Sequence, residues 1–342
     1  MDTSLSHQGS LPFLPSRRDS PRRMNGGVCA LLPWRRKVRY DSMVVAASAG
    51  AGASLDAPLV PRSAQGKFLS CVLTKKRPLF HFAVADLLKQ LAEDKEAALS
   101  RMFLSSGSDE ASLHRRIAQL KESNCQTAIE DIMYMLILYK FSEIRVPLVP
   151  KLSSCVYNGR LEVWPSKDWE LESIHSCDVL ELIKEHSNAV ISLRVDSTLT
   201  DDLETTEIDK HHLSRVYTAS ILYGYFLKSA SLRHQLECSL SEGIITKQLR
   251  HYISGFDPKI LQRCAKPRSR EAKNLIEKQT LALFGPEEGK DEGSIVVASF
   301  SSLKRLLLEA VAFGTFLWDT EEYVDGAFKL KENENAEENS SV

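Results

Sequence analysis

Apolar side chains recur at intervals of three and four residues through most of the chain beyond residue 77, and this period predicts helices. Asp257-Pro258 is a good helix start, because Asp can cap a helix whose first turn holds proline. Gly285-Pro286 is a good helix stop. Helices are therefore predicted over about 78–102, 113–120, 127–141, 179–190 and 210–236, between 258 and 284, and over 298–328.

Two of these helices depart from a simple one-faced stripe. Residues 132–138 are apolar on every side, which predicts burial all round and a central position. Ser220 and Gly224 lie one turn apart, and their small size would let a neighbouring helix approach closely. A local packing contact explains this pair more simply than a dimerisation motif does.

One segment changes to a strand-like pattern, at residues 153–164. Asn158-Gly159 separates two short apolar-rich stretches and supplies the two positive φ angles that a two-residue hairpin turn needs. Pro165 closes the second stretch, and the polar, acid-rich segment 196–209 predicts a loop. The predicted fold class is therefore mainly α, a multi-helix bundle-like body with one short β-hairpin near 153–164.

The first 46 residues differ in composition from the rest of the chain. They hold only three acids and are rich in Ser, Pro, Gly and Ala, with no helical or strand period. Such a segment predicts an organelle transit peptide, whereas a secretory signal would contain a continuous apolar stretch. A disordered tail over 1–70 is the alternative. The basic residues of this leader are Arg17, Arg18, Arg22, Arg23, Arg35, Arg36, Lys37 and Arg39.

Without the leader, the rest of the chain is acidic. The whole chain has 44 basic and 45 acidic side chains. Removing the leader's eight basic and three acidic residues leaves 36 and 42, a net charge near −6. An acidic surface argues against nonspecific nucleic-acid binding. No apolar run reaches the roughly 18 residues of a membrane span.

These features predict an organisation in six segments. They are a transit peptide (1–46), a flexible lead-in (47–76), a helical core domain with the hairpin (77–285), a linker (286–297), a C-terminal helix packing on the core (298–328) and a disordered acidic tail (329–342). The seven cysteines form no C-x-x-C pair, which favours buried thiols over a disulfide framework and leaves a redox switch open.

Catalytic and cofactor motifs do not stand out in this sequence. Glycine-rich phosphate loops and the G-x-S-x-G elbow do not occur. The densest set of possible metal ligands has only fragments of a known spacing, so we predict neither a metal nor a cofactor. That set is His175, Cys177, Glu181, Glu185 and His186. His211-His212 is interpreted as an exposed helix start.

Two clusters could bind something other than a metal. A basic turn offers Arg263, Lys266, Arg268 and Arg270 to an anion or an RNA backbone, although no aromatic stacking platform is interleaved with it. Otherwise it is a turn between helices. Near the hairpin, Tyr157, Trp164 and Trp169 could form a protein interface. The preferred interpretation of these three rings is core packing.

Several blocks of sequence together resemble one plant family. They are 111–121, 128–136, 157–164, 223–228, 256–258 and 277–285. The family is the chloroplast group of unknown function that includes the UV-B-induced chloroplast protein, and the likeness spans roughly residues 66–320. The resemblance implies a plastid location and a largely helical domain. It brings no established reaction or active-site residues.

Three functional hypotheses remain. The first is a noncatalytic, soluble stromal protein acting through contacts with other stromal proteins, in a stress or light (UV-B) response. The second is an enzyme or small-ligand binder with a pocket between helices and hairpin, at which Glu130, Arg145, Arg160 and His175 would converge. The third is an RNA-associated plastid protein, which the acidic charge disfavours. The sequence leaves the oligomeric state open.

Overall fold

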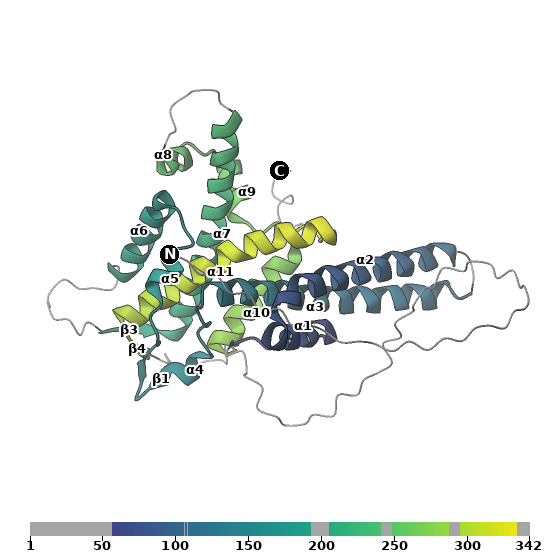
Figure 1. The fold of residues 1–342 in the computed structure, drawn as a ribbon, viewed down its shortest axis with the longest axis horizontal. Coiled ribbons are helices and arrows are strands. Elements are labelled where there is room, and N and C mark those ends of the chain that lie inside the picture. The colour runs from purple at the N-terminus through teal and green to yellow at the C-terminus, as the bar shows by residue number, and fades with distance from the viewer. Residues whose placement is uncertain are drawn as a thin grey trace, which may run out of the picture. The chain divides into compact units, whose positions relative to one another are not determined.

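The structure, a computed structural model, describes residues 57–105, 107, 109–192, 205–240, 248–286 and 295–333, all within the unit 51–342. As predicted, it is mainly α-helical (Figure 1). The predicted transit peptide and most of the predicted tail lie outside the described residues. The helices are α1 (Ala64–Lys75), the 3-10 helix η1 (Arg77–Leu79), α2 (Phe80–Leu104), α3 (Ala111–Glu143), α4 (Leu152–Cys155), α5 (Asp168–Glu172), α6 (Cys177–Ser192), α7 (Lys210–Leu240), α8 (Leu249–Ser254), α9 (Pro258–Ala265), α10 (Arg270–Phe284) and α11 (Phe300–Ala327).

The centre of the core is the crossing of α7 and α11. Every residue of α11 from 305 to 317 is buried, because apolar side chains occupy all sides of these turns. Two glycines allow the two backbones to touch: a Cβ on Gly224 would lie 2.0 Å from the Val311 carbonyl oxygen, and one on Gly314 would lie 1.9 Å from that of Ile221. The close neighbour expected beside Gly224 is therefore α11 of the same chain.

Helix α3 runs unbroken through a segment where two helices were predicted. Its apolar part, 128–138, is buried and packs among α1, α2, α10 and α11 (Figure 1). Residues 121–127 join the two predicted helices without a break, since they include neither Pro nor Gly to stop the backbone hydrogen bonds. The outcome is one long helix whose inner half is central and whose outer half extends beside α2.

The predicted hairpin is confirmed, but it belongs to a larger sheet. Strands β1 (Val156–Tyr157) and β2 (Arg160–Leu161) flank the Asn158-Gly159 turn, where φ is 51° and 76°. The sheet order is β1-β2-β4-β3, with β2 parallel to β4. The two further strands are β3 (Thr205–Asp209) and β4 (Ile295–Ser299), paired antiparallel.

The predictions of a loop over 196–209 and a linker over 286–297 are therefore wrong for the parts that form β3 and β4. Residues 196–204 and 287–294 lie outside the described residues. Each strand has only five residues, too few for a clear period of two. Their pairing also joins segments about 90 residues apart, which local periodicity cannot reveal.

Two chain segments expected to be flexible are ordered and packed. Within the predicted lead-in, α1 begins at Ser63, whose side chain accepts a hydrogen bond from the Gly66 amide (3.0 Å), and it buries Leu69, Val72 and Leu73. Within the predicted tail, residues 329–333 lie against α10, where the Arg270 amide donates to the Lys331 carbonyl (3.0 Å). Among the described residues, no helix has the length and apolar character needed to cross a membrane.

Candidate protein-interaction groove

Helices α2 and α3 form an antiparallel helical arm, joined through residues 105–110 (Figure 1). At its base, α1 packs against both helices, and the apolar stripe of α2 is buried there at Phe80, Val84 and Leu88. Past the N-terminal end of α1, which lies beside Asp131, the same two helices continue outward for several turns. Among the described residues, no third helix covers the outer half of the arm as α1 covers its inner half.

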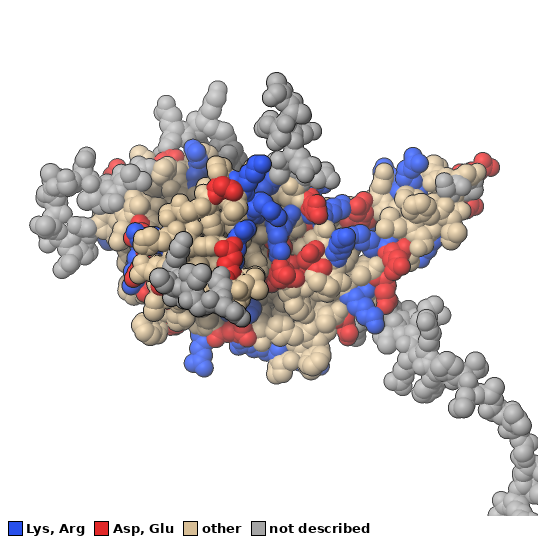
Figure 2. All heavy atoms as spheres, turned by 90° about the horizontal axis from the view of Figure 1, so that it is seen from above, with Lys and Arg blue, Asp and Glu red and all other residues tan. Residues whose placement is uncertain are grey.

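Large apolar side chains are exposed on this outer half. Figure 2 shows the end of the arm, at the right, as uncharged surface bordered by charged side chains. Leaving such groups in water forgoes the free energy of burial, so a cluster of them calls for an explanation. The exposed residues are Leu99, Phe103 and Leu104 on α2, and Leu113, Ile117 and Leu120 on α3.

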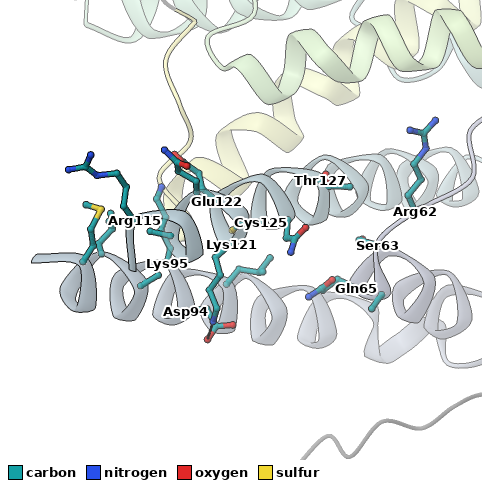
Figure 3. A pocket seen from close by; sticks show the side chains of 18 residues that line it. Arg62, Ser63, Gln65, Asp94, Lys95, Arg115, Lys121, Glu122, Cys125 and Thr127 are labelled. Atoms are coloured by element: carbon teal, nitrogen blue, oxygen red, sulfur yellow. Dashed lines mark ion pairs between the residues drawn. The ribbon is translucent and has the colours of Figure 1, made fainter. Parts of the chain in front are cut away.

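A groove of about 810 Å³ follows the arm between α2 and α3 (Figure 3). Its apolar lining includes Leu91, Ala98 and Met102 of α2 and Ala118 of α3. The two alanines fill little volume where the helices face one another, so space is left between them. Cys125 also lines the groove, and burial raises the pKa of its thiol, which disfavours the reactive thiolate form.

Charged side chains form the rim of the groove. Asp94 pairs with Lys121 across the arm (4.0 Å; Figure 3), and Glu122 pairs with Lys331 (2.8 Å). The hydrogen bond from Lys331 lowers the pKa of Glu122. Lys95 lies 4.6 Å from the centre of the Phe328 ring. The C-terminal segment thus braces one side of the arm through Lys331 and Phe328.

The first turn of α1 closes the base of the groove. Arg62, Ser63 and Gln65 line it there (Figure 3). The Asp131 carboxylate accepts hydrogen bonds from the amides of Arg62 (2.8 Å) and Ser63 (2.6 Å). The groove therefore has a rigid end, apolar sides and an open outer half.

The three aromatic rings near the hairpin are exposed. Tyr157 is 73% exposed, Trp164 83% and Trp169 81%. The preferred prediction that these rings pack on the core is wrong. Leu161 and Val163 take the inward positions of the second strand and its continuation, and alternation turns Trp164 outward.

The basic turn is largely engaged by the protein itself. The Arg268 guanidinium pairs with Glu322 (2.8 Å) and Glu321 (3.5 Å) and lies 5.3 Å from the centre of a Trp318 ring. Lys266 donates to the carbonyl of Asn333 (3.4 Å). Arg263 and Arg270 are exposed. The turn thus uses two of its four candidate residues to fasten α11 and the C-terminal segment.

The four polar residues proposed for an enzyme pocket do not meet. Glu130 binds Asn274 (2.8 Å) and Lys278 of α10, and Arg160 pairs with Glu162 beside the hairpin (3.8 Å). Arg145 lies two residues beyond the end of α3, with a φ of 57°. Burial lowers the pKa of His175 to about 4.

The fragments of a metal site are also dispersed. His186 Nε2 lies 2.9 Å from Ser220 Oγ and its ring stacks on Tyr223, while Glu185 pairs with Arg250. In the part of the chain that the structure describes, no three His, Cys, Asp or Glu side chains gather in a way that could hold a metal ion.

A buried ion pair on α11 escaped the sequence analysis. Arg305 and Glu309 are 1% and 0% exposed, with Nη1 and Oε2 2.9 Å apart. Arg305 also donates to the Pro147 carbonyl (2.8 Å), and the Val149 amide donates to Glu309 (2.9 Å). Burial raises the pKa of Glu309, against the opposing effect of Arg305. The only signal in the sequence was an Arg and a Glu four residues apart inside an apolar helix.

Fold and groove together define the class: a mainly α-helical protein with a small mixed sheet and a helical arm that exposes an apolar groove. Residues 112–240 match a family described as "Protein of unknown function (DUF760)". The chain is 35% identical over 349 aligned positions to a UV-B-induced chloroplastic protein of Arabidopsis thaliana, covering 85% of this chain and 82% of that relative. The chain belongs to the family of this relative. No solved structure matches this chain.

Proposed function

We propose that this protein works in the chloroplast stroma by binding other proteins, without catalysing a reaction, in a response to UV-B or related stress. The name of the Arabidopsis relative, UV-B-induced and chloroplastic, supports the location and the response. The arginine-rich, acid-poor leader supports import into the organelle.

One observation carries the proposal: the outer half of the arm holds six large, exposed apolar side chains, and one of them, Leu99, also lines the groove. On the inner half, equivalent positions are buried beneath α1 and the core. Exposed apolar clusters rimmed by charge are typical of protein–protein contact surfaces. The exposed rings of Tyr157, Trp164 and Trp169 offer a second contact surface of the kind that aromatic residues form at interfaces.

The two alternative functions receive less support. An enzyme would bring perturbed titratable groups together in one cleft, whereas Glu130, Arg160 and His175 make their contacts in separate places. An RNA-binding protein would present a continuous basic stripe, whereas Arg268 is paired with carboxylates.

Site-specific photo-cross-linking in isolated chloroplasts tests the proposal. A photoreactive amino acid replaces Leu120 in one variant and Glu181, an exposed residue of α6, in the control variant. We expect discrete cross-linked products from position 120 in the stromal fraction, and their loss when Ile117 is also changed to Ser. Equal labelling from both positions, or no product from position 120, would count against a binding function for the arm.

A further inference from the structure

We infer that the outer groove of the arm, together with the exposed apolar face of α3 that continues outward from its lining residues Asn124 and Thr127, binds an acidic amphipathic helix of a partner protein. This inference rests on the proposed function and deepens it, because it names the secondary structure and the charge of the partner.

Helix α1 shows which kind of element fits this surface. One face of α3 presents residues at alternating spacings of four and three: Leu113, Ile117, Leu120, Asn124, Thr127 and Asp131. The inner end of this face holds the start of α1, where Asp131 accepts the amides of Arg62 and Ser63. Contact is so close there that a Cβ on Gly66 would lie 2.7 Å from the Asp131 Cβ. At the outer end of the same face, Leu113, Ile117 and Leu120 are exposed in the part of the chain that the structure describes.

The occupant must therefore resemble α1 in shape. Helix α1 buries Gly66, Leu69, Val72 and Leu73, which recur at spacings of one, three and four. The groove is lined on α2 from Leu91 to Met102, a rise of about 16 Å, which is three helical turns. A helix with a stripe of leucine-like residues fits this length and continues the packing that α1 begins.

The charge of the rim indicates an acidic partner. Both carboxylates that line the groove are already paired, Asp94 with Lys121 and Glu122 with Lys331. Arg62 and Arg115 also line it, and neither makes an ion pair with another described residue. At the outer end, the exposed Arg101 and Arg116 are offset by the exposed Asp109 and Glu110, so the positive charge of the groove comes from Arg62 and Arg115. A second copy of this chain would bring the same arginines together, so it is the less favourable occupant.

The probe is a synthetic, fluorescently labelled peptide of about 14 residues, with Leu at spacings of three and four and Glu on both flanks. A matched peptide carries Lys in place of Glu. The protein is the full chain, and binding is measured by fluorescence anisotropy. The leader is itself basic and would attract the Glu peptide. The decisive comparison is therefore between variants of the arm, because all of them carry the same leader.

We expect the Glu peptide to bind more tightly than the Lys peptide. Changing Ile117 and Leu120 to Ser together should weaken binding by about tenfold, because each half-exposed side chain loses part of its burial. Leu261→Ser on α9, 46% exposed, is the control and should change nothing. Changing Arg62 and Arg115 to Glu should reverse the preference between the two peptides.

Several outcomes would overturn the inference. The first is equal affinity for the two peptides, and the second is Glu-peptide affinity that does not change when Ile117 and Leu120 become Ser. The third is no peptide binding because a segment of this chain fills the groove. The fourth is a dimer in sedimentation that Leu120→Ser dissociates. If position 120 cross-links to stromal proteins and the Glu peptide does not compete, the proposed function stands and this inference fails. If position 120 cross-links to nothing, the proposed function fails as well.

Discussion

Gly314→Ala should destabilise the protein, because the new methyl group has no space at the α7–α11 crossing. The built Cβ lies 1.9 Å from the Ile221 carbonyl oxygen and 2.8 Å from the Tyr225 amide nitrogen. Both neighbours are backbone atoms, so no side chain can rotate away. Relief requires the two central helices to separate.

The magnitude follows from two opposing effects. Overpacking a core typically costs about 1–3 kcal/mol, and a backbone clash lies at the upper end of that range. Replacing Gly by Ala inside a helix favours folding by about 1 kcal/mol. The net expectation is a loss of about 2 kcal/mol, which lowers the melting temperature of a domain this size by about 4–8 °C.

Gly326→Ala is the matched control, on the same helix. A Cβ at Gly326 meets nothing within 4 Å, so only the helix preference remains and stability should be unchanged or slightly higher. The assay is urea unfolding followed by circular dichroism. Equal midpoints for Gly314→Ala and Gly326→Ala would refute the close crossing of α7 and α11.

Three further predictions address the core and the leader. The pKa of His175 is about 4 in the folded protein against 6.5 in the unfolded chain. The stability that depends on neutral His175 is therefore present above pH 6.5 and is lost as the pH falls toward 4, by up to about 3 kcal/mol. In urea titrations, His175→Asn should remove this part of the pH dependence. Arg305→Met should cost about 3–5 kcal/mol in the same assay because Glu309 is left as an unpaired buried charge, and the double change with Glu309→Leu should recover most of the loss. Import of the full chain into isolated chloroplasts should yield a product shorter by about 46 residues, and an uncleaved product would contradict the transit peptide.

Periodicity was enough to predict most of the long helices, but it did not reveal α1 or the short helices α4, α5 and α8, nor which helices pack together. The stripe of Leu303, Leu307 and Leu317 identified α11, and the Asn158-Gly159 turn identified the hairpin, because both signals are local. Strands β3 and β4 could not be predicted. Their stabilising contacts come from pairing across a long stretch of sequence, and five residues each carry too little pattern.

The candidate groove depends on the same kind of long-range information. The sequence shows Leu113, Ile117 and Leu120 as a narrow apolar stripe, which usually indicates a buried face. Whether that face is buried depends on the length of α1, which starts at Ala64 and covers only the inner half of the arm. Exposure of Trp164 likewise follows from which side of the second strand and its continuation faces the core.

Hydrogen–deuterium exchange of the complex with a cross-linked stromal partner tests the central claim most directly. The partner is first identified through position 120 and then purified. The account predicts that adding it slows exchange at the amides of the outer arm, around residues 97–120, and leaves those of α6 and α9 unchanged. Protection confined to other elements, with the outer arm exchanging as fast as in the free protein, would contradict the account.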